Sequence, residues 1–412
     1  MRGTAGRPYR AIPGPSVVPD RVLQAMHRPA PDIYGGALHA MTATLYPDLR
    51  RVVGTDAHVA IYIGNGHAMW EAAIANLFSP GDRVLCFATG HFGHGWAQVA
   101  RAMGVEVETL DCGRRSAGDM AQLDAALRAD AGHRLRAVMV THVDTASSAR
   151  SDIAAIRAVL DAAGHPALLM VDAIASVGCD PMRMDAWGVD VLLGASQKGL
   201  MTPPGLGFLW FSERARAAGR GASLRSPYWD WEARIGGAEF YQLFCGTAPT
   251  HHLYGLRTAL DMLLHEEGLD AALARHRRLA AAVWAAVDAW GQGGSMALNM
   301  ADPAARAHGV TAVRLDAPHA TRLREWCDSV AGVTLGIGLG MAARDDPQWH
   351  GFFRIAHMGH VNAHMTLGVL AAMDAGLKAL GIAHGRGAVE AAAASLARDG
   401  GEAGAVPDCA AQ

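Results

Sequence analysis

Short apolar segments alternate with amphipathic segments from about residue 57 to residue 211. The apolar segments are rich in Val, Ile, Leu and Phe, which is typical of buried β-strands, and several amphipathic segments between them predict helices. The predicted strands cover residues 58–63, 83–87, 105–110, 135–141, 167–171, 189–193 and 207–211. The predicted helices include residues 69–77, 120–128 and 153–163. This alternation favours an α/β fold with a mainly parallel seven-stranded sheet that helices cover on both faces.

The pattern changes after about residue 255, where a long alanine-rich segment predicts a helix over residues 269–290. Two further strands (311–315 and 351–357) and two helices (321–331 and 365–380) indicate a smaller α+β domain. We therefore expect four parts along the chain. They are an N-terminal segment (1–20), a large domain (21–268), a small C-terminal domain (269–400) and a disordered Gly/Ala-rich tail (401–412).

Composition narrows the class of protein. The chain has 412 residues, 51% of them apolar and 18% charged, which is typical of a globular protein with more than one core. A net charge of −3 gives no reason to expect nucleic acid or an anionic membrane as a partner. No apolar stretch approaches the roughly 20 residues that span a bilayer. The six cysteines form no Cys-x-x-Cys pair, which favours reduced thiols in the cytoplasm.

An aspartate and a lysine follow two of the predicted strands. Asp172 ends the strand over residues 167–171, and Lys198 follows the strand over residues 189–193. This carboxylate and this amine suit pyridoxal phosphate, with which the lysine would form a Schiff base while the aspartate keeps the ring nitrogen protonated. The alternative is a surface lysine and an aspartate that caps a helix.

A glycine-containing turn, Gly64-Asn65-Gly66-His67, joins the first predicted strand to a helix. Glycines allow a close approach of the backbone to a ligand, and the first amides of a helix attract an anion. The turn lacks the third glycine of a dinucleotide fingerprint and the Gly-Lys-Ser/Thr of a P-loop. It therefore suits a single phosphate, with an ordinary strand-to-helix turn as the alternative.

Three other positions are candidates for binding. Phe92, after the strand over residues 83–87, can stack on a planar cofactor or belong to the core. Thr145 lies in a segment rich in small hydroxyl residues, which can hydrogen-bond a cofactor oxygen or form a solvated turn. Arg354 lies within an apolar strand, where its partner is a substrate carboxylate or an internal acid. His91 and His94 have no evident third ligand, so we expect no metal site.

Several motifs resemble those of the class V pyridoxal-phosphate-dependent aminotransferases, in particular the alanine/serine–glyoxylate group. They are Val171-Asp172-Ala173-Ile174-Ala175-Ser176, Gly188-Val189-Asp190, and Ser196-Gln197-Lys198-Gly199-Leu200-Met201 with Pro203-Pro204-Gly205. The resemblance runs from Pro13-Gly14-Pro15-Ser16 to the segment of Arg354. It implies fold type I, in which a large domain binds the cofactor, a small C-terminal domain binds the substrate carboxylate, and the active site lies at a homodimer interface.

The resemblance also assigns roles to residues. It makes Lys198 the Schiff-base lysine and Asp172 the partner of the ring nitrogen, and it implies further cofactor contacts from Asn65, Gly66, His67, Phe92, Thr145, Ile174, Gln197 and Thr247. Thr247 matches a threonine that reaches the phosphate of the neighbouring subunit. Arg354 matches the arginine that holds the substrate α-carboxylate. Tyr34 and Gly35 fall in the N-terminal segment that lines the substrate pocket of the partner.

Three departures from the family pattern concern contacts around the cofactor and not the lysine, the aspartate or the arginine. The middle residue of the phosphate turn is Asn65, the segment before the hydroxyl residues begins with Asp144, and a tyrosine of some relatives is Phe244 here. The resemblance thus implies ping-pong transamination from serine, alanine or aspartate to glyoxylate or a similar 2-oxo acid. It implies a homodimer or a tetramer. The alternatives are pyridoxamine–pyruvate transamination and a non-catalytic binding protein on the same scaffold.

Overall fold

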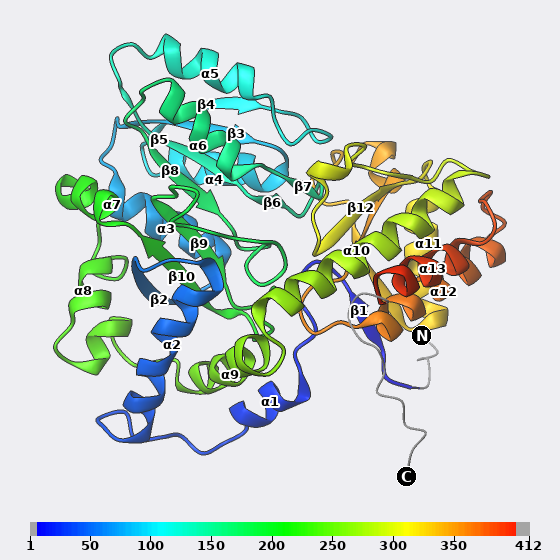
Figure 1. Ribbon diagram of the computed structural model, residues 1–412, viewed down its shortest axis with the longest axis horizontal. Helices are drawn as coiled ribbons and strands as arrows, with labels where there is room; N and C mark the ends of the chain where they lie inside the picture. Colours follow the sequence, from blue (N-terminus) through cyan, green and yellow to red (C-terminus); the bar gives the residue numbers. More distant parts are fainter. Residues whose placement is uncertain (1–5, 401–412) are drawn as a thin grey trace.

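The computed structural model describes residues 6–400, and its larger unit is a seven-stranded sheet between layers of helices (Figure 1). In spatial order the strands are β2 (His58–Gly64), β10 (Gly205–Phe211), β9 (Val191–Ala195), β8 (Leu168–Asp172), β5 (Leu135–Thr141), β3 (Arg83–Ala88) and β4 (Glu106–Asp111). The strand pairs are parallel except for the two that involve β10. The predicted mainly parallel sheet is confirmed, and the predicted strand ends differ from the observed ones by at most two residues.

Both faces of this sheet are buried against helices. Alternate side chains of a strand point to opposite faces, so each strand contributes to two cores. In β2, Val59 and Ile61 join one core cluster, whereas Ala60 and Tyr62 join another. The first cluster contains residues of α2 (Ala37–Val53), α5 (Met120–Ala129), α6 (Ile153–Ala162) and α9 (Thr250–Leu260). The second contains residues of α3 (Gly66–Leu77), α4 (His91–Ala102) and α7 (Glu213–Ala218). The parallel strands therefore end at one edge of a sheet that is packed on both sides, where ligands of α/β proteins bind.

The hydrophobic pattern did not predict α2, α4 or α9. Helix α4 shows the reason, because it contains Gly93 and Gly95, and glycine disfavours the helix interior. The helix forms because Trp96, Ala97 and Ala100 are buried in the folded chain. Tertiary packing thus overrides local propensity at this helix.

The second unit is a five-stranded sheet covered by C-terminal helices, and it confirms the predicted small α+β domain. Its strands, in spatial order, are β1 (Tyr9–Ala11), β13 (Val333–Ile337), β14 (Phe352–Ala356), β12 (Val310–Arg314) and β11 (Ala297–Leu298). The helices are α10 (Leu269–Gly291), α11 (His319–Trp326), α12 (Ala363–Ala379) and α13 (Ala388–Gly400). Strand β1 comes from the N-terminal segment and pairs in parallel with β13, so residues 9–11 belong to the sheet of this unit (Figure 1).

The predicted limits of the parts, 1–20, 21–268 and 269–400, remain predictions. The predicted tail, 401–412, lies outside the described residues. No helix within residues 6–400 has both the length and the apolar character needed to cross a membrane.

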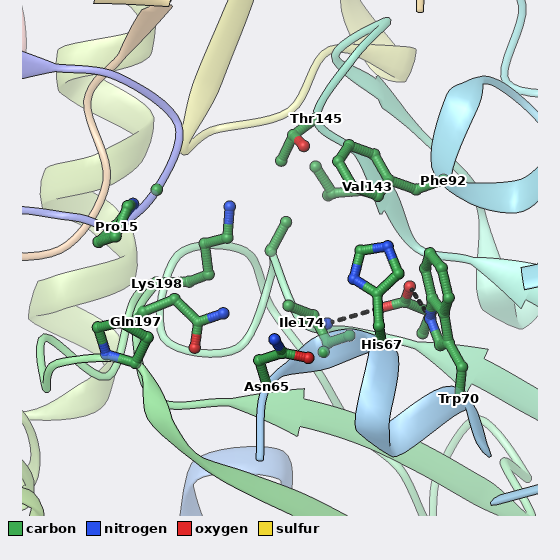
Figure 2. Close-up of a pocket in the computed structure, with 15 residues that line it drawn as sticks. Pro15, Asn65, His67, Trp70, Phe92, Val143, Thr145, Ile174, Gln197 and Lys198 are labelled. Carbon is green, nitrogen blue, oxygen red and sulfur yellow. Dashed lines mark hydrogen bonds between the residues drawn. The ribbon is translucent and has the colours of Figure 1, made fainter. Parts of the chain in front are cut away.

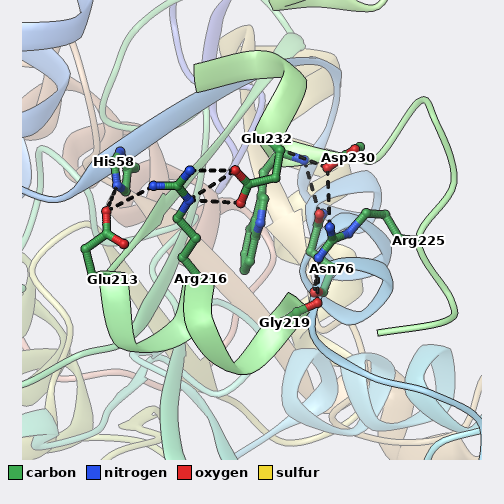
Figure 3. Close-up of polar contacts among 9 residues, drawn as sticks. His58, Asn76, Glu213, Arg216, Gly219, Arg225, Asp230 and Glu232 are labelled. Carbon is green, nitrogen blue, oxygen red and sulfur yellow. Dashed lines mark hydrogen bonds and ion pairs between the residues drawn. The ribbon is translucent and has the colours of Figure 1, made fainter. Parts of the chain in front are cut away.

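The segment between β10 and α9 lies outside the sheet, and charged residues bind it to the large unit (Figure 3). Arg216 on α7 binds Glu232 of α8 (Trp231–Gly236) with N–O distances of 2.8–3.0 Å. Arg225 donates to the carbonyl oxygens of Asn76 (3.2 Å) and Gly219 (2.6 Å), which ties the loop to α3. Single exposed ion pairs contribute little stability, but this connected set holds the segment that leads to Thr247.

Candidate active site

One cavity of about 260 Å³ lies at the carboxyl edge of the large sheet, and its wall contains the predicted cofactor residues with one exception (Figure 2). The residues that it brings together are Asn65, Gly66, His67, Phe92, Thr145, Asp172, Ile174, Gln197 and Lys198. Thr247 is not among them. These residues come from five loops that follow β2, β3, β5, β8 and β9, so the parallel arrangement of the strands gathers them at one place.

Lys198 follows β9 and extends its amine into this cavity. Its Nζ donates a hydrogen bond to the carbonyl oxygen of Pro13, and its own carbonyl oxygen accepts from Ser16 Oγ at 2.7 Å. Burial and the positive charge of Arg354 lower the pKa of Lys198 to about 8, although the carboxylate of Asp172 opposes them. A lowered pKa makes the neutral amine, which is the nucleophilic and basic form, available near neutral pH.

Asp172 is the last residue of β8 and its side chain is buried, with 4% of the residue exposed. Oδ1 accepts from the backbone N–H of Ile174 at 2.9 Å, and Oδ2 accepts from Nε1 of Trp70 at 2.8 Å. Burial raises the pKa of Asp172 to about 6, and these two donors work against that rise. A protonated ring nitrogen beside this carboxylate would stabilise its charged form, which burial disfavours by removing water.

The start of α3 forms the opposite end of the cavity. Asn65 caps the helix, because its Oδ1 accepts from the N–H of Ala68 at 3.3 Å. A Cβ at Gly66 would lie 2.7 Å from Cδ1 of Ile174, so a larger residue here would displace the end of that side chain at the cavity wall. The side-chain amide of Gln197 points its nitrogen into the cavity, and its buried oxygen has no hydrogen-bond partner among the described residues (Figure 2). The backbone N–H groups at this helix N-terminus and the side-chain nitrogen of Gln197 are donors that suit one phosphate.

A buried carboxylate positions the side wall. Asp144 Oδ2 accepts from the N–H groups of Phe92 (2.8 Å) and Gly93 (3.3 Å), and Oδ1 accepts from that of Ala146 (2.9 Å). These bonds fasten the start of α4 to the loop that carries Thr145. Asp144, which stands where the family pattern has a glutamate, thus accepts hydrogen bonds from three backbone N–H groups. Phe92 is half-buried at the cavity wall, which leaves its ring available for stacking.

Arg354 lies on β14 of the small unit, with 6% of the residue exposed. Its Nε donates to the carbonyl oxygen of Ile337 at 2.7 Å and its Nη1 to that of Thr145 at 3.0 Å. Within residues 6–400 it forms no ion pair, and its Nη2 makes no hydrogen bond. Burial lowers its pKa to about 10, so it stays charged at neutral pH. Arg354 is therefore a fixed cation near Lys198 with one amino group free to hold a carboxylate.

The structure places Tyr34 and Thr247 away from Lys198. Both line a second cavity with Ile33 and Phe240, and Tyr34 is 89% exposed. Gly35 adjoins this segment, at the turn before α2. Phe244 is buried in the core of the large unit, where its ring packs against Phe240.

Six cavity residues were not among the candidate site residues of the sequence analysis, namely Gly14, Pro15, Trp70, Val143, Ala175 and Pro204. Trp70 follows His67 by three residues on a predicted helix, so the helical period places both on one face. Val143 precedes Thr145 by two residues. These spacings are the signals that could have identified Trp70 and Val143. Among residues 6–400, no group of three or more His, Cys, Asp or Glu side chains could hold a metal ion.

These groups fit pyridoxal phosphate at three points. The amine of Lys198 can bond the aldehyde, the carboxylate of Asp172 can hold the ring nitrogen, and the start of α3 with Gln197 can hold the phosphate. The side-chain nitrogen of Gln197, which faces the cavity, can donate to a phosphate oxygen, and Gly66 adds no side chain that would fill the space beside Ile174.

Comparison with known proteins agrees with this fit. The family model "Aminotransferase class-V" matches residues 11–363. The serine–glyoxylate aminotransferase of Methylorubrum extorquens is 35% identical over 402 residues, which cover 96% of this chain and 97% of that protein. The L-aspartate–glyoxylate aminotransferase of Paracoccus denitrificans is 34% identical over 376 residues (90% and 91%). The pyridoxamine–pyruvate aminotransferase of Mesorhizobium loti superposes with a TM-score of 0.86 at 26% identity, over 97% of this chain and 100% of that one. The chain therefore belongs to the class V aminotransferases and is a pyridoxal-phosphate-dependent transaminase of fold type I.

Proposed function

We propose that this transaminase moves the amino group of serine, alanine or aspartate to glyoxylate or a similar 2-oxo acid in a ping-pong cycle. The observation that carries the proposal is that Lys198 and Asp172 line one cavity, while Arg354, which does not line it, lies near enough to lower the pKa of Lys198 and binds the carbonyl oxygen of Thr145 in the cavity wall. A single buried cation beside the lysine suits substrates that share one α-carboxylate. Relatives named for serine, aspartate and alanine with glyoxylate support the same substrate class.

The residues divide the work of the reaction. When bound, pyridoxal phosphate supplies an aldehyde that bonds the amino group and a ring that accepts the electron pair left when Cα loses its proton. Lys198, with its lowered pKa, would accept that proton from Cα as a general base and would then donate it as a general acid. The carboxylate of Asp172 would hold the ring nitrogen in its protonated form. Arg354 holds the carboxylate through its free Nη2, which orients the Cα–H bond.

The cavity wall excludes water and limits substrate size. Pro15, Phe92, Val143 and Ile174 give the site an apolar lining. Because the same cavity of about 260 Å³ must hold the cofactor as well, we expect donors with small side chains. An apolar lining also strengthens the charged contacts made by Asp172 and Arg354.

We further propose a homodimer, or a tetramer built from such dimers, with shared active sites. Tyr34 is exposed on one chain, and Thr247 faces a second cavity that adjoins it. In the proposed dimer, Tyr34, Gly35 and Thr247 of each chain complete the site of the other. We propose a cytoplasmic location, supported by five free cysteines among the described residues.

A second candidate, pyridoxamine–pyruvate transamination, is favoured by one observation. Phe244 has no hydroxyl group and is buried, so it makes no contact with a phosphate of the kind that a tyrosine in its place could make. A site that holds the phosphate less firmly suits a substrate that lacks one.

The deciding experiment is a spectrophotometric screen of the purified protein. Amino acids are tested against glyoxylate and pyruvate, and pyridoxamine is tested against pyruvate without added coenzyme. Transfer from serine, alanine or aspartate supports the main proposal. Turnover of pyridoxamine with no transfer between amino and 2-oxo acids replaces it by the second candidate, and inactivity in every arm would favour a non-catalytic binding protein.

A further inference from the structure

Trp70 joins the two ends of the cofactor cavity and has no role in the chemistry described above. It lies on α3, three residues after His67, and only 2% of it is exposed. Its Nε1 donates to Oδ2 of Asp172 at 2.8 Å, across 102 positions of the chain (Figure 2). An indole N–H is a donor only, and a buried carboxylate that accepts it is favoured in the charged form.

The indole is held firmly by its surroundings. Its ring lies 4.4 Å from the ring of His67 and 6.4 Å from that of Phe92, measured between centroids. A Cβ on Gly95 of α4 would lie 3.3 Å from the far edge of the indole, so the glycine leaves room for it. The ring therefore connects the phosphate turn, the stacking position and Asp172 within one packed group.

Each oxygen of Asp172 then has one fixed donor. Ile174 N–H binds Oδ1 and Trp70 binds Oδ2, and the remaining lone pairs are free to face the cavity. Without Trp70, the carboxylate would keep only one donor in a site where burial disfavours its charge. The side chain would also be free to rotate away from the cavity.

We propose that Trp70 is a positioning residue of the transamination reaction, which orients the Asp172 carboxylate and favours its ionised form so that the ring nitrogen stays protonated. This inference rests on the proposed function of Asp172. The inference adds that a hydrogen bond between α3 and β8, from Trp70 to Asp172, helps to keep the ring nitrogen protonated and so helps the ring to accept electrons.

A matched control is available in the same core cluster. Trp96 on α4 is also fully buried, but its Nε1 has no hydrogen-bond partner among the described residues. Trp70→Phe and Trp96→Phe thus remove the same part of an aromatic ring, and only the first removes a hydrogen bond. A general loss of packing would affect both variants, whereas loss of positioning would affect only the first.

The first test uses the wild-type full chain without coenzyme and does not depend on activity. In the protein labelled with ¹⁵N-tryptophan, the Nε1–H signal of Trp70 should shift with pH around a midpoint near 6, the pKa of Asp172. Asp144 and Lys198 lie near Asp172 and affect that pKa, and His67 packs on the indole and also titrates. The Asp172→Asn variant gives the contribution of His67, so the difference between the two titrations reports Asp172. An unchanged titration in Asp172→Asn would overturn the proposal, even if Trp70→Phe does not fold.

The second test measures the half-reaction with an amino donor in the coenzyme-loaded enzyme. Trp70→Phe should slow it about tenfold, as expected for loss of one charge-assisted hydrogen bond, and Trp96→Phe should stay within about twofold of wild type. In the Asp172→Asn background, Trp70→Phe should have little further effect, because the two residues act together. Equal rates for the two tryptophan variants, or undiminished slowing in Asp172→Asn, would overturn the proposal and leave the proposed function intact. An inactive wild-type enzyme would instead count against the proposed function, while the titration could still be measured.

Discussion

Two regions that the family resemblance assigns to the active site differ in how one chain holds them. Around Lys198, Asp172 and Arg354, the side chains are buried and are fixed by hydrogen bonds to the backbone or to Trp70. Around Tyr34 and Thr247, the residues line an open surface cavity, and Tyr34 is almost fully exposed. The residues of the first region are brought together within a single chain, whereas we propose that those of the second act where another chain covers them.

The largest effect is expected for Lys198→Ala, which should abolish turnover. Among the residues that line the cavity, no other carries an amine, so neither the bond to the cofactor aldehyde nor the proton transfer at Cα has a substitute. Borohydride reduction of the wild-type protein followed by peptide mapping should find the cofactor on the peptide that contains Lys198. Attachment to a different lysine would place the reacting centre elsewhere.

Asp172→Asn should slow the half-reaction at least tenfold, because it removes the negative charge beside the ring nitrogen while keeping the size of the side chain. Stopped-flow measurement of the half-reaction with the amino donor tests this. The amide oxygen can accept from only one of the two donors, Ile174 N–H or Trp70 Nε1–H, so the variant also loses one of these hydrogen bonds. Rates equal to wild type would show that Asp172 does not contact the cofactor ring.

Arg354→Lys keeps the positive charge but loses the planar guanidinium group. In the wild type, that group donates to two carbonyl oxygens through Nε and Nη1 and still has Nη2 free. We expect KM to rise about tenfold for donor and acceptor alike, since both carry the same carboxylate. The affinity of the apoprotein for coenzyme, measured by titration, should scarcely change. A rise in KM for only one of the two substrates would contradict a shared carboxylate site.

The smallest effect tests the second region directly. A mixed dimer carries Lys198→Ala in one chain and Thr247→Ala in the other. If Thr247 serves the partner's site, one site has both changes and the other has none, so about half of the wild-type activity should remain. If Thr247 serves its own chain's site, each site carries one change, and activity falls well below half. The homodimer of Thr247→Ala is the control and should retain coenzyme less well than wild type.

Several features of the fold and site were predictable because they are local. Strands in the middle of a parallel sheet are buried on both faces, so their apolar runs are visible, and the residues after those runs lie at the sheet edge. Asp172 and Lys198 were found in this way, and the turn at Asn65 and Gly66 was found from its glycines. Strands β1, β11 and β13 were not predicted, because they are short edge strands or lack a clear pattern. Helix α4 was missed because its glycines hide a helix that packing stabilises.

By itself, the sequence determined the alternation of strands and helices, the edge at which the candidate residues lie, and the pairing of a lysine with an aspartate. These features can be read from the periodicity of residues that are close together in the sequence, without knowledge of the fold. Only the tertiary structure decided that Trp70 reaches Asp172, and that Arg354 binds the carbonyl of Thr145 across 209 positions. Such contacts depend on the spatial order of the strands and on how the small unit packs against the large one. Residues far apart along the chain meet only when those two arrangements are set.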